Sequence, residues 1–196
     1  MSSPARRIGV LGSLCNPPHV GHAALARQAV AQLGLAHVLL VPTGHPSHRP
    51  EPAEPPAIRL RLAVAAAADE PVFVVSPVEV ERAGPSYMAD TLEVLAEQHA
   101  DAELVLLLGA DQAATLDHWH EPERVRALAM IAVAPRPGAG PIDDAAVLAL
   151  ALPLLEVSSS DIRGRVARGD SIDGLVTPAV EALIVAAGLY GPEAAG

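Results

Sequence analysis

The sequence predicts an α/β fold: a doubly wound parallel sheet with helices on both faces and a small C-terminal helical part. Two observations lead to this prediction. Apolar runs of strand length alternate along the chain with longer segments whose apolar residues recur at helical spacing. Residues 104–108 are apolar at every position, as expected of a central strand that is covered on both faces.

Each expected element follows from its local pattern. Residues 8–11 form the first apolar run, and a loop with Gly and Pro leads from it into a helix over about residues 21–33. Gly34 follows that helix, as is typical of a helix C-terminus. Residues 42–57 are rich in Pro and His and are expected to form a loop. Assigned in the same way are strands at residues 38–41, 72–75, 104–108, 130–134 and 154–157, and helices at about residues 58–69, 89–98, 160–168 and 178–187.

The length of 196 residues predicts one domain over residues 1–196. Its C-terminal helical portion is expected at about residues 158–196. In a sheet of this kind, ligands bind beyond the carboxyl ends of the strands. The unusual clusters of this sequence follow expected strands, so we expect them to meet at that edge.

Composition restricts the partners. The net charge of −10 argues against nucleic acid or an anionic membrane, since both need an electropositive face. Apolar runs are far shorter than the roughly 20 residues of a bilayer span. All 13 basic residues are arginines, which excludes a Gly-Lys-Ser/Thr phosphate loop and Schiff-base chemistry. We expect small-molecule partners, no nucleic acid and no membrane; the oligomeric state stays open, a homo-oligomer included.

Cysteine usage and the N-terminal residues bear on location. The single cysteine, Cys15, excludes an internal disulfide framework. Residues 1–7 contain neither an apolar signal core nor a small-residue cleavage site. We therefore expect a cytoplasmic location.

Residues 12–22, Gly-Ser-Leu-Cys-Asn-Pro-Pro-His-Val-Gly-His, join the first expected strand to the first expected helix. Glycine lets a backbone approach a phosphate, and a helix N-terminus presents unpaired N–H groups to an anion. His19 and His22 are three residues apart, so a helical first turn places them on one side. The alternative is a Pro-rich turn with two unrelated histidines. The glycines, the prolines and the strand-to-helix setting favour a phosphate-binding corner.

Residues 157–163, Val-Ser-Ser-Ser-Asp-Ile-Arg, form a second cluster. On one interpretation, Ser158 and Asp161 are a capping box that only starts a helix. On another, Ser159 and Arg163, four residues apart, bring hydroxyls, N–H groups and a guanidinium to one helix end, which suits a triphosphate. The two interpretations are compatible.

Trp119 is the single tryptophan of the chain, and polar residues surround it in the sequence. A flat ring in such a setting is able to stack on a pyridine base. A tryptophan of the core or of an interface is the alternative.

The two clusters expected to bind phosphate, residues 12–22 and residues 157–163, resemble segments of a known family. Residues 12–22 resemble the Gly-Gly/Ser-Thr-Phe-Asp/Asn-Pro-x-His-x-Gly-His segment of the His-x-Gly-His nucleotidyltransferases, with Leu14 and Cys15 replacing Thr and Phe. Residues 157–163 resemble their Ile-Ser-Ser-Thr-x-Ile-Arg segment. The resemblance implies a Rossmann-like fold. It implies His19, His22 and Arg163 as catalytic residues and an ATP site of Gly12, Ser13, Leu14, Asn16, Gly21, Gly109, Asp111, Ser158, Ser159 and Ser160.

Other segments resemble one branch of that family, the bacterial nicotinate mononucleotide adenylyltransferases. Residues 85–92 resemble their Ser-Tyr-Thr-x-Asp-Thr-Leu segment, with Met88 in place of Thr. Residues 109–119 resemble a segment that begins Gly-Ala-Asp and ends in Trp, and residues 42–49 stand where the branch has Pro-Pro-His-Lys. The implied acceptor site consists of His48, Arg49, Ser86, Tyr87, Met88, Trp119 and Arg136.

The resemblance implies transfer of AMP from ATP to nicotinate mononucleotide, giving deamido-NAD and pyrophosphate in NAD biosynthesis, with Mg²⁺ carried on the triphosphate. Such transfers rely on positioning and charge stabilisation, so Cys15 is expected to have no covalent role. A structural zinc is not expected, because His45 and His48 have no further ligands at a recognisable spacing.

Other functions stay open at this point. The acceptor is nicotinamide mononucleotide or phosphopantetheine in related transferases, and cytidylyltransferases use CTP. Trp119 and residues 86–92 weigh against phosphopantetheine and CTP. A catalytically silent nucleotide-binding paralogue is a further alternative, because Leu14, Cys15 and Met88 depart from the family pattern.

Overall fold

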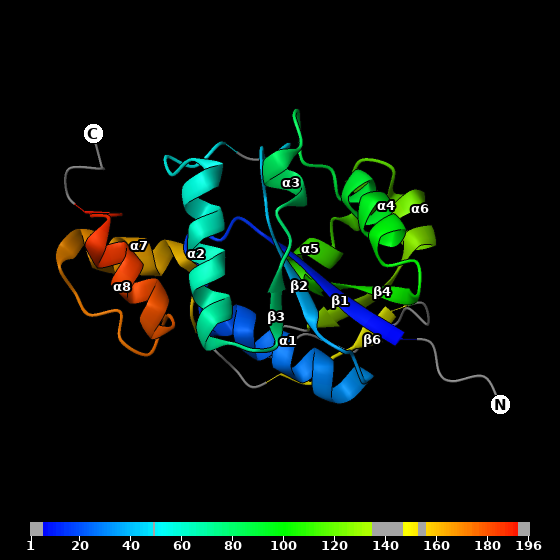
Figure 1. Cartoon of the computed structure of the whole chain (residues 1–196), viewed down its shortest axis with the longest axis horizontal. Helices are drawn as coiled ribbons and strands as arrows, with labels where there is room; N and C mark the ends of the chain where they lie inside the picture. Colours follow the sequence, from blue (N-terminus) through cyan, green and yellow to red (C-terminus); the bar gives the residue numbers. More distant parts are fainter. Residues whose placement is uncertain (1–5, 49, 135–146, 153–155, 192–196) are drawn as a thin grey trace.

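The computed structural model describes residues 6–48, 50–134, 147–152 and 156–191. Its centre is a six-stranded sheet in the order β3-β2-β1-β4-β5-β6, with every neighbouring pair parallel (Figure 1). The predicted doubly wound parallel sheet is thereby confirmed. The strands are β1 (Arg6–Ser13), β2 (Val38–Pro42), β3 (Phe73–Val75), β4 (Ala102–Gly109), β5 (Ala129–Ala134) and β6 (Val147–Ala149).

The longer helices lie within two residues of the predicted bounds. They are α1 (Val20–Leu33), α2 (Pro56–Asp69), α4 (Met88–Gln98), α7 (Ser159–Arg168) and α8 (Pro178–Ala186). Four short elements were not predicted, because three to seven residues carry too little of a helical period: α3 (Val78–Glu81), α5 (Ala110–Ala113), the 3₁₀ turn η1 (Leu116–His118) and α6 (Pro122–Leu128). No helix of the described ranges is long and apolar enough to cross a membrane.

The strand order creates a crevice at the middle of the sheet. Gly9 of β1 pairs with Val38 of β2 on one side and with Val105 of β4 on the other. After β1 the chain proceeds outward to β2 and β3, and after β4 it proceeds in the opposite direction to β5 and β6. The connections that follow β1 and β4 therefore diverge, and the space between them is where doubly wound folds bind ligands.

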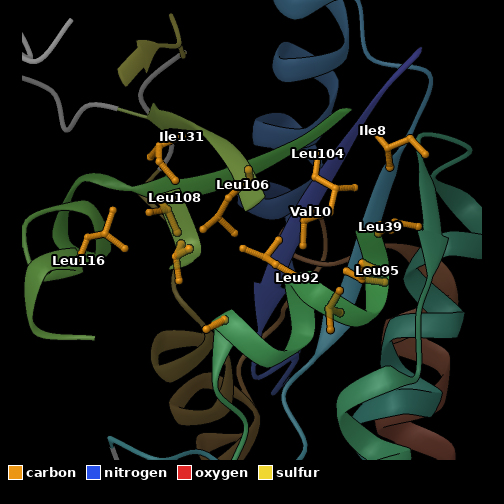
Figure 2. Close-up of a cluster of buried hydrophobic side chains, with 14 of the residues drawn as sticks. Ile8, Val10, Leu39, Leu92, Leu95, Leu104, Leu106, Leu108, Leu116 and Ile131 are labelled. Atoms are coloured by element: carbon orange, nitrogen blue, oxygen red, sulfur yellow. The ribbon is translucent and has the colours of Figure 1, made fainter. Parts of the chain in front are cut away.

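Two core clusters, one on each face of the sheet, hold the helices in place. On one face, aliphatic side chains of the central strands pack against α4 and the η1 turn (Figure 2). The side chains labelled there are Ile8, Val10, Leu39, Leu92, Leu95, Leu104, Leu106, Leu108, Leu116 and Ile131. On the other face, Leu107 of β4 belongs to a cluster with Ala26 and Ala29 of α1. The continuous apolar run of β4 is explained, because its side chains are buried on both faces.

The C-terminal helices α7 and α8 pack on the outer side of α2, away from the sheet (Figure 1). A third core cluster joins them, in which Leu62 of α2 contacts the same group of side chains as Ile162 of α7 and Ile184 of α8. Tyr190, which follows α8, is also a member of this cluster. The predicted helical part is therefore attached to the sheet domain through α2.

The strand predicted over residues 154–157 is wrong in its described half. Residues 154 and 155 lie outside the described residues, and Glu156 and Val157 have no strand conformation. The last described strand is instead β6, earlier in the same apolar stretch, where Val147 pairs with Ile131 of β5. Residues 147–155 are apolar almost throughout, so their pattern could not show which part pairs with β5.

A pair of substitutions on α8 tests whether the C-terminal helices share one cooperative unit with the sheet. Ile184 is 1% exposed and its neighbour Val185 is 75% exposed. Ile184→Ala is expected to lower the free energy of unfolding by about 2–4 kcal/mol, because it leaves a cavity between α8 and α2. Val185→Ala is expected to change it by less than about 0.5 kcal/mol. Urea unfolding should show one transition for both variants; a separate early transition for Ile184→Ala would contradict a single domain.

Candidate active site

A cavity of about 1020 Å³ lies beyond the carboxyl ends of β1 and β4. It occupies the crevice expected from the strand order, and both phosphate clusters of the sequence border it. Most of the predicted site residues line it, namely Gly12, Ser13, Leu14, Asn16, His19, Gly21, His22, His48, Ser86, Tyr87, Met88, Gly109, Asp111, Trp119, Ser159, Ser160 and Arg163. Segments up to about 150 positions apart in sequence thus form one pocket.

The two histidines begin helix α1 and cap it reciprocally. His19 is the N-cap residue, and its Nδ1 accepts a hydrogen bond from the backbone N–H of Gly21 at 3.2 Å. Nδ1 of His22 accepts from the backbone N–H of His19, also at 3.2 Å. The rings lie 3.9 Å apart between centroids. Both imidazoles therefore use one nitrogen to satisfy the helix start, a role that Ser or Asp more often performs.

This arrangement determines the protonation of both rings. Burial, assisted by the neighbouring His22, lowers the pKa of His19 to about 2, and burial lowers the pKa of His22 to about 4. At neutral pH both rings are uncharged. Since Nδ1 accepts in each case, the single ring proton sits on Nε2. In His22 this Nε2 lies 2.9 Å from Oγ of Ser13, which also accepts from the N–H of Cys15 at 3.1 Å. The histidines thus present N–H donors and not cations.

The N-terminus of α7 meets the loop that precedes α1. Oγ of Ser159 donates to the carbonyl of Pro17 at 2.9 Å. The guanidinium of Arg163 donates through Nη1 to the carbonyl of Asn16 at 2.8 Å and through Nη2 to Oγ of Ser160 at 3.2 Å. Two helix N-termini and one arginine therefore converge on the same cavity. N–H groups of helix N-termini and a guanidinium are the donors that phosphate oxygens require.

Ser158 has the capping role that one interpretation of the sequence assigned to it. Its Oγ accepts from the backbone N–H of Asp161 at 3.1 Å, at the N-cap position of α7. Ser158 does not border the cavity. The polar residues of this segment that border the cavity are Ser159, Ser160 and Arg163.

A buried arginine that the sequence did not single out joins the loops around the cavity. Arg59 of α2 is 0% exposed and donates to the carbonyl oxygens of Leu14, Gly44 and Glu54 at 3.2, 2.7 and 3.1 Å, and also to that of Thr43. Burial lowers the pKa of its guanidinium. In the sequence Arg59 is one charged residue in an amphipathic helix, so no local signal distinguished it from a solvated one.

Aromatic side chains also border the cavity. The ring of Tyr87 lies 4.1 Å from that of His120, with 31° between the planes. Trp119 packs partly against the first core cluster and donates through Nε1 to Oγ1 of Thr115 at 3.2 Å. Cε of Met88 lies against β1, where a β-carbon on Gly12 would come within 2.7 Å of it. His120 is exposed and was not predicted to belong to the site.

Ser86 and the buried Glu79 shape the loop after β2. Oγ of Ser86 accepts from the N–H groups of Gly44 and His45, both at 3.1 Å. Glu79, which also borders the cavity, accepts from Oγ1 of Thr91 at 2.8 Å. Burial raises the pKa of Glu79, and hydrogen bonds from Thr91 and Ser86 oppose the rise. Only glycine fits at position 44, because a β-carbon there would lie 2.1 Å from the Glu79 carbonyl oxygen.

Two predicted acceptor residues, Arg49 and Arg136, lie outside the described residues. The described parts of the chain contain no group of three or more His, Cys, Asp or Glu side chains placed to hold a metal ion. Cys15 is buried, and burial raises the pKa of its thiol to about 12. Its thiol is therefore protonated at neutral pH, which makes it a poor nucleophile.

Comparison with known proteins gives one consistent result. A family model described as Cytidylyltransferase-like matches residues 11–165. A Thermomicrobium roseum protein named probable nicotinate-nucleotide adenylyltransferase is 38% identical over 195 residues, which cover 94% of this chain and 91% of that protein. An Albidiferax ferrireducens protein of the same name is 41% identical over 194 residues, covering 94% and 98% of the two chains.

A solved structure has the same fold. Plasmodium falciparum nicotinic acid mononucleotide adenylyltransferase complexed with NaAD superimposes with a TM-score of 0.77, covering 94% of this chain and 97% of that chain. The identity is 16%, so this likeness supports the fold alone.

The lowered pKa values of the two histidines predict a stability that depends on pH. In the unfolded chain their pKa is about 6.5, so below that pH the unfolded state binds protons that the folded state does not. Their contribution to stability is complete above about pH 7 and is lost as pH falls from about 6.5 toward 4. Between pH 7.5 and 5, the wild type should lose about 3–4 kcal/mol more unfolding free energy than a His19→Asn/His22→Gln double variant. Equal losses in urea titrations would show that the histidines are not neutral in the folded state.

Proposed function

The chain belongs to the cytidylyltransferase-like family and, within it, to the nicotinate-nucleotide adenylyltransferases, and we propose that its central cavity transfers AMP from ATP to nicotinate mononucleotide. The products are deamido-NAD and pyrophosphate. One observation carries the assignment to this cavity. The capped start of α1 and the N-terminus of α7 with Arg163 border the same cavity as Tyr87 and Trp119, so donors for a triphosphate and rings for a base belong to one cavity.

ATP occupies the part of the cavity between the two helix N-termini. Its β- and γ-phosphates accept hydrogen bonds from the backbone at Ser159 and Ser160 and from the guanidinium of Arg163. The Nε2–H of His19 faces the α-phosphate, and the Nε2–H of His22, which lies 2.9 Å from Oγ of Ser13, is shared between that hydroxyl and the phosphate. The adenosine lies along the ends of β1 and β4, against Gly12 and Gly109. The backbone N–H of Gly109 is 3.4 Å from Oε1 of Gln112 before any ligand binds.

The acceptor mononucleotide occupies the part of the cavity that is bordered by Tyr87, Trp119 and His120. Its pyridine ring stacks on Trp119, which is half-buried and anchored through Thr115. Residues 86–88 lie on the other side of the ring, where their backbone N–H groups are suited to the nicotinate carboxylate. Ser86 stabilises this segment and does not bind the acceptor directly, because its hydroxyl oxygen accepts hydrogen bonds from the backbone N–H groups of Gly44 and His45. His48 belongs to the loop that covers this end.

The reaction is a direct displacement. An oxygen of the mononucleotide phosphate attacks the α-phosphorus of ATP, a P–O bond forms, and the bond to the pyrophosphate oxygen breaks in line with it. Negative charge moves onto the leaving pyrophosphate, where Arg163 and the α7 N-terminus stabilise it. Mg²⁺ is carried on the triphosphate with phosphate oxygens and water as ligands. No protein nucleophile is needed, in agreement with the protonated thiol of Cys15.

Pyrophosphate release from purified protein tests the assignment. With ATP and Mg²⁺, nicotinate mononucleotide is expected to support turnover with a kcat/KM at least tenfold above that of nicotinamide mononucleotide. Greater activity with nicotinamide mononucleotide would make that mononucleotide the assigned acceptor and would leave the assigned reaction type unchanged. ATP binding without pyrophosphate release on either acceptor would contradict the function.

Substitution of His22 tests the proposed catalytic role of the phosphate-binding corner, residues 12–22. His22→Ala removes an Nε2–H donor from the reacting phosphates and is expected to lower kcat about 100-fold or more. The loss of its capping bond lowers stability by about 1 kcal/mol, so the fold is retained. His99→Ala is the matched control, since His99 lies at the C-terminus of α4 and outside the cavity lining. Near-normal kcat in His22→Ala would refute the assignment of this histidine.

A further inference from the structure

The side chain of Asn16 lies at a junction of three distant segments. It is 3% exposed, and each of its polar atoms has a protein partner. Oδ1 accepts a hydrogen bond from the Tyr190 hydroxyl at 2.6 Å, and Nδ2 donates to Oε2 of Glu54 at 2.7 Å. Tyr190, itself 5% exposed, follows α8, and Glu54 precedes α2. One amide thus joins the phosphate loop to the C-terminal part and to the loop after β2.

The partners determine the orientation of this amide. Burial raises the pKa of Tyr190, so its hydroxyl remains protonated and donates. The Glu54 carboxylate only accepts, so it requires the Nδ2 side of the amide. Rotating the amide by half a turn would place Oδ1 against that carboxylate and leave Nδ2 facing a donor. An aspartate at position 16 would likewise bring two carboxylates together, which is unfavourable at this separation.

The position of Asn16 also sets the position of the groups that face the phosphates. Its own carbonyl accepts from Nη1 of Arg163 at 2.8 Å, and the carbonyl of the next residue, Pro17, accepts from Ser159 at 2.9 Å. His19 follows two residues later as the cap of α1. A displacement of Asn16 would therefore move the arginine, the α7 N-terminus and the histidines relative to one another.

The resemblance implied that Asn16 binds ATP; we propose instead that Asn16, although it borders the cavity, is a positioning residue whose side chain, held between Tyr190 and Glu54, sets the geometry of the phosphate-binding corner without itself contacting ATP. This inference rests on the proposed function for its kinetic readout. It assigns a role to Tyr190 at the end of the C-terminal part: its hydroxyl orients the Asn16 side chain and thereby the phosphate-binding corner. It also explains why this chain, with Glu54 opposite, has an amide and not a carboxylate at position 16.

The contact is tested by removing and then reversing its hydrogen bonds. Tyr190→Phe removes one hydroxyl and is expected to lower kcat/KM for ATP about tenfold, since it removes one of the two buried hydrogen bonds that orient the Asn16 side chain. Asn16→Asp is expected to lower it about 100-fold. Adding Glu54→Gln to Asn16→Asp restores a donor opposite an acceptor and should recover at least tenfold. The KM of the mononucleotide acceptor should change less than threefold throughout.

Thr177→Val is the matched control for Tyr190→Phe. Thr177 belongs to the same C-terminal part, and its buried hydroxyl has no hydrogen-bond partner among the described residues. Its loss should leave kcat/KM and the thermal midpoint near those of the wild type. Unchanged kcat/KM in folded Tyr190→Phe and Asn16→Asp, or no recovery in the double variant, would overturn the inference.

Calorimetric binding of α,β-methylene-ATP to the same variants separates this inference from the proposed function. The dissociation constant should increase about tenfold in Asn16→Asp and recover in the double variant, whether or not the wild type turns over. If the wild type releases no pyrophosphate with either mononucleotide, the function fails while this binding series still decides the role of Asn16. Equal dissociation constants in wild type and Asn16→Asp would count against the positioning role.

Discussion

The buried guanidinium of Arg59 supplies hydrogen bonds that the loops around the cavity cannot make among themselves. The carbonyl oxygens of Leu14, Thr43 and Gly44 lie just beyond the ends of β1 and β2, where the strand ladder stops. A buried carbonyl without a donor costs about 1–3 kcal/mol, so several of them together would prevent these loops from packing. Arg59 satisfies them from a helix that is itself fixed by the third core cluster, which contains Leu62 and Ala66 of α2. The two loops consequently form one wall of the cavity.

The side chains proposed to act on the phosphates make structural contacts largely through other atoms than those of their proposed chemical roles. His19 and His22 satisfy backbone N–H groups through Nδ1 and keep a proton on Nε2. Arg163 is oriented by the carbonyl of Asn16, and the same planar guanidinium has further N–H groups for a phosphate. Such side chains are held before the ligand binds, which lowers the reorganisation needed in the transition state. The low pKa values of the histidines follow from the same burial that orients them.

Long elements and clustered motifs were predictable from the sequence, and short or isolated features were not. The apolar run of β4 and the helical period of α1, with Gly34 in the left-handed conformation after it, carry their signal over many residues. The elements α3 and α5 are four residues each and carry almost none. The last strand was predicted at residues 154–157 and not at β6, because the apolar stretch that contains β6 has no period. The roles of Arg59 and Tyr190 were missed because they contact residues up to 45 and 174 positions away in the chain. Glu79 was missed because it belongs to the short helix α3, whose sequence has no distinguishing pattern.

Patterns among near neighbours in the sequence were sufficient to predict the fold class, the strand–loop–helix setting of residues 12–22 and the residue types that suit phosphate binding. The roles of individual atoms followed from the three-dimensional structure. It showed that the Nδ1 atoms of both histidines serve the helix start, that Ser158 is a cap, and that both polar atoms of Asn16 are occupied by Tyr190 and Glu54. The physical reason is that hydrogen bonds are directional and local in space, whereas their partners here are up to 174 positions apart in the chain.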